Sequence, residues 1–279
     1  MHPVRKHLST ILIAMLLIVG SALLLYPSFS NYLNSKHASG LITDYNKAVI
    51  NAGSEEKERM LKEAEDYNKD LLPGAFSDAG NDDEYNRNLD ITGTGIMGYI
   101  DIDKIGVELP IYHGVEKEVL QIGAGHLEGS SLPVGGEGTH CVLSGHRGLP
   151  SAKLFTDLDE LEVGDIFTIK VLDRVLTYKI DQIKVVLPSE TEDLMPIPGE
   201  DHCTLLTCTP YGINTHRLLV RGTRVADEAE ESPKIFVANE AFEVDTLIVA
   251  PVMAVPMFLI TIGATYVISY IKNKKRKEQ

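Results

Sequence analysis

Two long uncharged stretches constrain this chain more than any other feature of its sequence. Leu8 to Tyr26 carries no charge over 19 residues, and Leu247 to Ile271 carries none over 25. About 20 apolar helical residues cross a bilayer core, so each stretch is long enough to span one. A cleavable signal peptide is the alternative for the first stretch, and a buried core helix for the second. No small-residue cleavage site precedes Pro27, and the second stretch has no polar face, so two membrane spans are favoured.

Basic residues lie between each stretch and the nearer end of the chain. Arg5 and Lys6 precede the first, and the tail KNKKRKEQ, Lys272 to Gln279, follows the second. The positive-inside rule therefore predicts that both termini are cytoplasmic and that the residues between the spans lie outside the cell membrane. Over the whole chain acidic residues prevail, 40 Asp and Glu against 26 Lys and Arg, for a formal net charge of -14. Nucleic acid is not expected as a partner, because phosphate binding needs clustered cations.

The region between the spans changes from helical to β character. Gly40 to Leu72 has helical spacing with a break at Gly53, which predicts two helices, and the Gly- and Asp-rich stretch Leu71 to Asn88 predicts a loop or flap. From Gly98 onward, short alternating runs are separated by Gly- and Pro-rich turns. This pattern is typical of a mostly β domain, either a closed barrel or a sandwich.

Three cysteines lie in the external region, Cys141, Cys203 and Cys208. Five residues of strand would separate Cys203 from Cys208 by about 16 Å, too far for a disulfide. Alternation also places these two on opposite faces, so Cys203 is predicted to be a core residue, and so is Cys141. The chain has no CxxC motif or paired-histidine spacing, and neither a metal nor a cofactor is predicted.

The segment TLLTCTPYGINTHRLLVRG reads as a hairpin with Cys208 at the end of one strand and Arg217 near the start of the next. Pairing of these strands would bring the guanidinium beside the thiol, where it can stabilise a developing oxyanion. A core cysteine and an edge charge are the equally open alternative.

A thiol nucleophile needs a base, and the chain has nine histidines. His146, in LSGHRGLPS, ends an apolar run between two glycines and is the best candidate. His113 is interpreted as structural, while His126 and His140 follow glycine-rich turns and fit surface positions.

The segments TLLTC, CTPYGINTHRLLVRG and GHLEGSSLPVGGEGTHCVLSGHRGLPSAKLFTDLDELEVGD resemble class C sortases, the pilin-polymerising branch of the sortases. The resemblance covers roughly residues 91 to 225. It implies an eight-stranded sortase β-barrel with Cys208 as nucleophile, His146 as catalytic histidine and Arg217 as transition-state arginine. It also implies cleavage of an LPxTG-like sorting signal between Thr and Gly, a thioester on Cys208, and transfer to a pilin lysine. Partners would be pilin subunits and the membrane lipid bilayer.

Class C enzymes usually carry a lid with an Asp-Pro-aromatic motif. The matching stretch here is PGAFS, in which Gly74 replaces the acid, Ala75 the proline, and Phe76 keeps the aromatic ring. This predicts a lid that is present but held only weakly, because it lacks the carboxylate. A loop without a lid role is the alternative. Two other functions stay open: a housekeeping-type sortase that attaches proteins to cell-wall peptidoglycan precursor, and a non-catalytic surface scaffold.

These inferences divide the chain into seven segments. They are a cytoplasmic flank (1–7), a transmembrane helix or signal anchor (8–26), extracytoplasmic helices with the lid loop (27–90), the catalytic β-barrel (91–225), an acidic linker (226–246), a second transmembrane helix (247–271) and a basic cytoplasmic tail (272–279).

Overall fold

The computed structural model describes residues 4–72, 74, 76, 83–225, 262, 263 and 266. Two compact units divide the chain: Asn31–Ser232, and Met1–Ser30 together with Pro233–Gln279. The helices are α1 (Val4–Asn51), α2 (Ser54–Asp70), α3 (Asp83–Arg87) and α4 (Lys117–Leu120), with short 3-10 turns η1 (Asp103–Ile105), η2 (Leu158–Glu160) and η3 (Glu192–Leu194). The strands are β1 (Ile96–Ile102), β2 (Val107–His113), β3 (Ala124–His126), β4 (Thr139–Ser144), β5 (Ile166–Val171), β6 (Arg174–Val186), β7 (Asp201–Thr209) and β8 (His216–Arg224).

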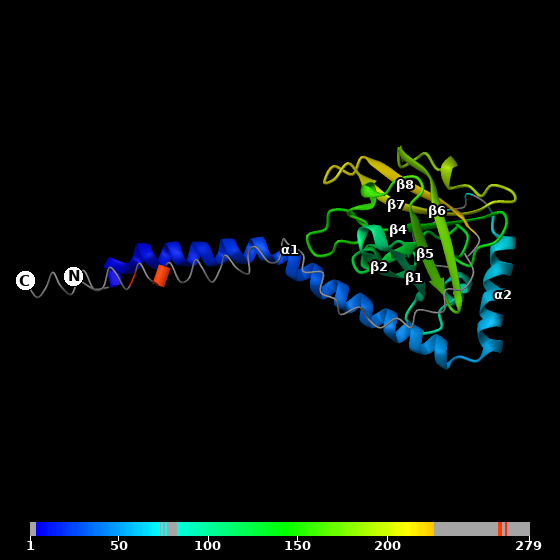
Figure 1. Cartoon of the computed structure of the whole chain (residues 1–279), viewed down its shortest axis with the longest axis horizontal. Coiled ribbons are helices and arrows are strands. Elements are labelled where there is room, and N and C mark those ends of the chain that lie inside the picture. Colours follow the sequence, from blue (N-terminus) through cyan, green and yellow to red (C-terminus); the bar gives the residue numbers. More distant parts are fainter. Residues whose placement is uncertain are drawn as a thin grey trace, which may run out of the picture. The chain divides into compact units, whose positions relative to one another are not determined.

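The strands of the Asn31–Ser232 unit form one closed barrel in the order β1-β2-β3-β4-β7-β8-β6-β5 (Figure 1). Neighbours are antiparallel except β2 with β3 and β4 with β7, which are parallel. Alternate side chains fill the interior, as in β5, where Phe167, Ile169 and Val171 are buried. The resemblance predicted an eight-stranded barrel, and the structure confirms it over the sandwich that the strand pattern alone left open.

Helices α1, α2 and the short α3 precede the barrel in the chain, and the predicted break at Gly53 is present between α1 and α2. Glu55 and Glu56 occupy the first turn of α2 and Lys69 its last, which suits the helix dipole. Tyr45 fixes the end of α1 to the barrel, since its hydroxyl donates to the Met97 carbonyl (2.9 Å) and accepts from the Leu172 amide (2.7 Å).

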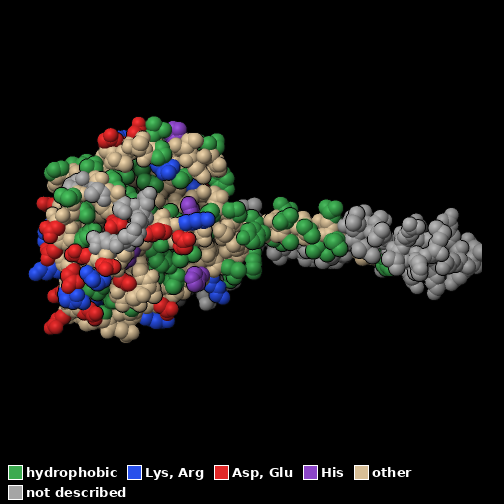
Figure 2. Space-filling model, turned by 180° about the vertical axis from the view of Figure 1, so that it is seen from behind, with side chains coloured by type: hydrophobic (Ala, Val, Ile, Leu, Met, Phe, Trp, Pro, Cys, Tyr) green, Lys and Arg blue, Asp and Glu red, His purple; other side chains and the backbone are tan. Residues whose placement is uncertain are grey.

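Helix α1 is longer than the predicted span of residues 8–26, because it continues through Pro27 to Asn51. A proline removes one intrahelical hydrogen bond, and the helix beyond it is held by packing of Ile42 and Tyr45 against the barrel core. One described helix, Met15–Asn51, is long and apolar enough to cross a membrane. Hydrophobic side chains of its first part are exposed, Leu24 at 80% (Figure 2). The predicted second span (247–271) and the acidic linker lie outside the described residues, apart from three isolated positions.

His140 joins β4 to the connection between β6 and β7. Its ring nitrogens lie 3.1 Å from the Met195 carbonyl and 2.7 Å from the Thr204 hydroxyl. Burial lowers the pKa of His140 to about 4, against about 6.5 in the unfolded chain. The sequence interpretation of His126 and His140 as surface residues is wrong, since both are buried. Glycine-rich turns precede them, but the side chains themselves point into packed interior.

We expect the folded barrel to lose stability as the pH falls from about 6.5 to about 4. Over this window the unfolded chain binds a proton at His140 and the folded chain does not, so the stability contributed above pH 6.5 is progressively lost. The contribution is of the order of 3 kcal/mol. Melting curves across this range should therefore show a shallower pH dependence for His140→Gln than for the unchanged chain. Parallel curves would contradict the assignment, whatever the absolute stability of the variant.

Candidate active site

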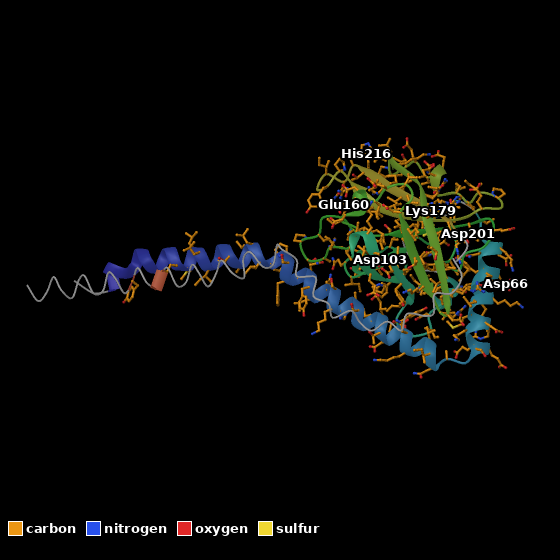
Figure 3. All side chains as sticks on the ribbon, viewed as in Figure 1. Asp66, Asp103, Glu160, Lys179, Asp201 and His216 are labelled. Carbon is orange, nitrogen blue, oxygen red and sulfur yellow. The ribbon has the colours of Figure 1, made fainter. Side chains whose placement is uncertain are left out.

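The hairpin of β7 and β8 pairs a cysteine with an arginine across its two strands, and the arginine's guanidinium donates to the Asn214 and His216 carbonyls (3.4 and 3.2 Å). Cys208 and Arg217 are direct cross-strand partners, as the sequence predicted. Cβ atoms of such partners lie about 4.5–5.5 Å apart on one face of the sheet. Cys203, Leu205 and Thr207 are buried on the inner face, so Cys208 belongs to the outer face, where it is half-buried. Figure 3 marks His216 at this end of the hairpin and Asp201 at the other.

Parallel pairing of β4 with β7 determines at which end of the barrel strands His146 lies. Ser144 is the partner of Leu206, and the ladder continues as the Gly145 amide donates to the Leu206 carbonyl (3.0 Å). Thr207 then donates its hydroxyl to the Gly145 carbonyl (2.7 Å). His146 and Cys208 each lie two residues beyond Ser144 and Leu206, so the shared register brings them to the same end of neighbouring strands.

Two glycines shape the loop that carries His146. A Cβ on Gly145 would lie 2.5 Å from the Phe155 ring, so this ring can pack against the backbone only if residue 145 is glycine. Gly148 has φ +77°, a left-handed conformation that favours glycine, and lies against the Tyr211 ring. The loop is therefore held on one side by Phe155 and on the other by Tyr211 of the β7–β8 connection.

Arg147 links the loop after β4 to the residue after the thiol. Its guanidinium forms an ion pair with Asp159, lies 3.5 Å from the Thr209 hydroxyl and is 6.0 Å from the centre of the Tyr211 ring. The side chain is only 10% exposed. Sequence reasoning missed this residue, whose only signal was its position directly after His146. The arginine joins the two segments that follow His146 and Cys208.

The imidazole of His146 is half-buried, and its ring makes no hydrogen bond to any residue that the structure describes. Burial lowers the pKa of His146, and the nearby positive charge of Lys117 lowers it further. The neutral ring therefore prevails at pH 7, in a form able to accept a proton. No Asp or Asn among the described residues orients the ring as in a Cys-His-Asn triad.

The outer face of the same sheet carries an apolar floor. Leu206 and Leu219 are also cross-strand partners. They lie two residues from Cys208 and Arg217 along their strands, so all four residues belong to the same face. They belong to a cluster with buried Val142 and Leu194, and Phe76 packs against it. Gly74 lies beside Met195, and Ala75 is outside the described residues. The aromatic residue of the predicted lid thus contacts the surface that leads to the thiol.

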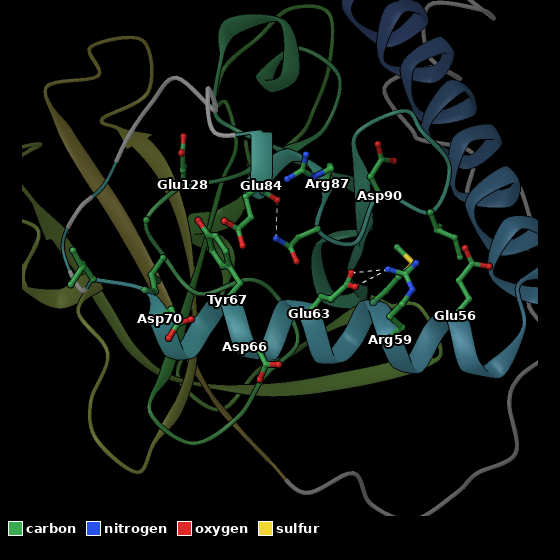
Figure 4. A pocket seen from close by; sticks show the side chains of 16 residues that line it. Glu56, Arg59, Glu63, Asp66, Tyr67, Asp70, Glu84, Arg87, Asp90 and Glu128 are labelled. Atoms are coloured by element: carbon green, nitrogen blue, oxygen red, sulfur yellow. Dashed lines mark hydrogen bonds and ion pairs between the residues drawn. The ribbon is translucent and has the colours of Figure 1, made fainter.

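A cavity of about 1080 Å³ lies on another part of the barrel, between α2, α3 and the loop at Glu128 (Figure 4). Seven carboxylates and two arginines line it, and Arg59 donates two hydrogen bonds to Glu63 (2.8 and 2.9 Å). Cys208, His146 and Arg217 are not among its lining residues. In the part of the chain that the structure describes, no group of three or more His, Cys, Asp or Glu side chains is arranged to hold a metal ion.

The other two cysteines lie in the barrel interior, and His113 and His202 are buried elsewhere in the fold. Cys141 and Cys203 are buried in the barrel interior, as predicted, and all three cysteines are free. His113 is structural, as interpreted, because its ring nitrogens lie 3.0 and 2.8 Å from the Gly95 and Asn88 carbonyls. His202 is buried near the start of β7, at the far end from Cys208.

Comparisons with known proteins agree with this geometry. The sortase domain model matches residues 100–225. Sortase D of Bacillus subtilis is 31% identical over 172 residues, which cover 60% of this chain and 84% of that protein. Crystal structures of sortase C1 from Streptococcus agalactiae (48% identity, TM-score 0.63) and sortase C from Streptococcus pneumoniae (42%, 0.61) are similar over 67% and 68% of this chain and 99% of each of theirs.

The fold and the paired Cys208 and Arg217 are those expected of a cysteine transpeptidase, and the chain belongs to the sortase family. Its solved neighbours at 42–49% identity include class C sortases, the branch that the sequence resembles. The family assignment argues against the non-catalytic scaffold.

Proposed function

We propose that this sortase cleaves an LPxTG-like sorting signal and joins the acyl fragment to a lysine of a pilin subunit. The observation that carries the proposal is the register that puts Cys208 opposite Arg217 and His146 at the same strand end. Similarity to class C sortases supports the pilin assignment, since the S. pneumoniae sortase C structure is described in terms of pilin substrate specificity. Attachment to cell-wall peptidoglycan precursor is the competing acceptor reaction.

In the first half-reaction, the Cys208 sulfur attacks the Thr carbonyl carbon of the signal. Arg217 then donates hydrogen bonds to the oxyanion that forms. The C–N bond to Gly then breaks, His146 gives a proton to the leaving amine, and a thioester remains on Cys208. Because the lowered pKa of His146 keeps the ring neutral at pH 7, that proton comes first from the Cys208 thiol.

In the second half-reaction, the lysine amine attacks the thioester carbonyl and His146 accepts the amine proton. The C–S bond breaks, an isopeptide bond forms, and the proton returns to the sulfur. Arg217 serves the second oxyanion as it did the first. No metal or cofactor is required, because thiol, imidazole and guanidinium supply nucleophile, proton carrier and charge stabilisation.

The apolar floor of Leu206, Leu219, Leu194 and Val142 suits the Leu and Pro side chains of the signal. Phe76 packs against this floor, so lid and substrate would compete for one surface. Gly74 supplies no carboxylate to hold the predicted Gly74-Ala75-Phe76 lid, and the Phe76 ring provides an apolar contact with the floor. This favours a lid that is held weakly and opens readily.

Phe76→Ala is expected to increase the rate at which a thiol reagent labels Cys208 by about fivefold, as lost packing of about 1 kcal/mol implies for a half-buried ring. Leu72→Ala, at an exposed position four residues earlier, is the matched control and should label at the unchanged rate. Equal rates for Phe76→Ala and the control would contradict a lid role. Gly74→Asp is a less clean test, because Gly74 has φ +85° and a Cβ there would approach Met195.

The N-terminal part of α1 is proposed as a membrane anchor, and residues 247–271 as a second span. Basic residues at both ends would keep the termini cytoplasmic and place the barrel outside. There it would meet exported pilins that carry sorting signals.

The direct test is mass spectrometry of the full chain in detergent with synthetic sorting peptides. We expect an acyl adduct on Cys208, released by hydroxylamine and by a lysine peptide taken from a pilin. An adduct on another residue, or none with any peptide, would contradict the proposal. Release by a peptidoglycan-type amine, with no release by pilin lysine, would establish the competing acceptor.

A further inference from the structure

Two buried cysteines face each other inside the barrel. Cys141 of β4 and Cys203 of β7 are register partners in the parallel pair, with exposures of 3% and 0%. Partners in such a pair point to the same side of the sheet. The candidate reaction uses neither thiol.

The geometry of this pair suits a disulfide. Neighbouring strands lie about 4.7–4.9 Å apart, within the Cα separation of about 4.4–6.8 Å that a disulfide requires. Each of the two thiols shifts the pKa of the other, so the Cys141 and Cys203 side chains lie close together. No strand has to shift for a bond to form, in contrast to Cys203 and Cys208 along β7.

We propose that Cys141 and Cys203 are an oxidisable pair that forms a disulfide between β4 and β7. The oxidant is a small-molecule or protein disulfide. One cysteine thiolate attacks it, forming a mixed disulfide and releasing one thiol. The second cysteine attacks the first cysteine's sulfur and releases the second thiol. Two electrons and two protons leave the pair, and the oxidant's S–S bond is reduced to two thiols.

The structure also indicates when the pair can react. Because both side chains are sealed inside the closed barrel, exchange takes place while β4 and β7 are not fully packed, during folding or transient opening.

A bridge here would act on the candidate active site through the strands that carry it. His146 follows Cys141 by five residues, and Cys208 follows Cys203 by five residues. Within β7 this odd separation puts Cys208 on the face opposite Cys203, and His146 lies beyond the end of β4. The bond would thus lock the β4–β7 register from inside the barrel without entering the site. It would also close a loop of about 60 residues, long enough for a substantial effect on stability.

The test uses the full chain in detergent with Cys208→Ala, which removes the surface thiol. Samples are equilibrated in reduced or oxidised glutathione a few degrees below the melting temperature. They are then unfolded in denaturant that contains N-ethylmaleimide, which alkylates every free thiol. We expect two adducts from the reduced sample. From the oxidised sample we expect none, with a mass lower by two hydrogens and a cross-linked peptide containing 141 and 203. The oxidised form should melt roughly 5–15 °C higher.

Cys203→Ser in the Cys208→Ala background is the control. Its Cys141 should give one adduct in the reduced buffer, and no cross-linked peptide should form in the reduced or the oxidised buffer. Two adducts from the oxidised Cys208→Ala sample would overturn the proposal. Stable glutathione adducts without a cross-link would also overturn it. A cross-link that leaves the melting temperature unchanged would support the pair and contradict its role as a lock on the register.

Discussion

Replacing Cys208 with alanine is expected to reduce transpeptidation by about 10³-fold or more and to abolish the acyl adduct. The reason is that no other thiol lies at the surface of the described barrel: Cys141 and Cys203 are sealed in its interior. Without a nucleophile the enzyme keeps only binding and oxyanion stabilisation. The measurement is isopeptide formation between a sorting peptide and a pilin lysine peptide, together with the intact mass.

Cys203→Ala is the matched control, since it removes a thiol from the inner face of the same strand. It should form the adduct on Cys208 and retain transpeptidation, with a modest loss of stability. If Cys208→Ala still joined the two peptides, the nucleophile would have to be another residue and the assignment of this hairpin would fail.

His146→Gln is expected to lower turnover by about 10²–10⁴-fold, because it removes the group that is proposed to carry the proton in both half-reactions. The pH profile gives a sharper criterion. The lowered pKa of His146 means that activity in the unchanged chain should fall on the acid side only below about pH 6.5, as the ring becomes protonated. The residual activity of the variant should lack this limb.

His216→Gln provides the control for this second result. His216 pairs with Thr209, the position after Cys208, so it lies at the same end of the hairpin but on the alternate face from Arg217. Its replacement should leave both turnover and the acid limb in place. An acid limb that persisted in His146→Gln would assign the titration to a different group.

The sequence contained enough to place Cys208 beside Arg217, because a hairpin is a local structure whose strands alternate predictably. The partnership of His146 with Cys208 came only from the family resemblance. It depends on parallel pairing of β4 with β7, strands about 60 residues apart, and no local pattern encodes that register. Arg147 was missed for a related reason, as its partners Asp159 and Thr209 meet it only in the folded barrel.

The mostly β class and the break between α1 and α2 also followed from local signals. The burial of His126 and His140 did not, because glycine-rich flanks indicate a turn but not how a neighbouring side chain packs. Helix α1 extended past Pro27 because its later residues pack on the barrel, and this tertiary contact outweighs a local helix-breaking signal.

The parallel partnership of β4 and β7 has a consequence for how the enzyme matures. β5 and β6 lie between them in the chain and occupy the opposite part of the barrel, so this pairing is a contact of high sequence separation. Such contacts raise the contact order of a domain and slow its folding. A newly synthesised chain therefore has the Cys208 thiol, but its proposed proton carrier, His146, does not lie beside it until most of the barrel has closed. Reactivity toward sorting signals should appear only after folding nears completion, which protects incompletely folded chains from acylating their neighbours.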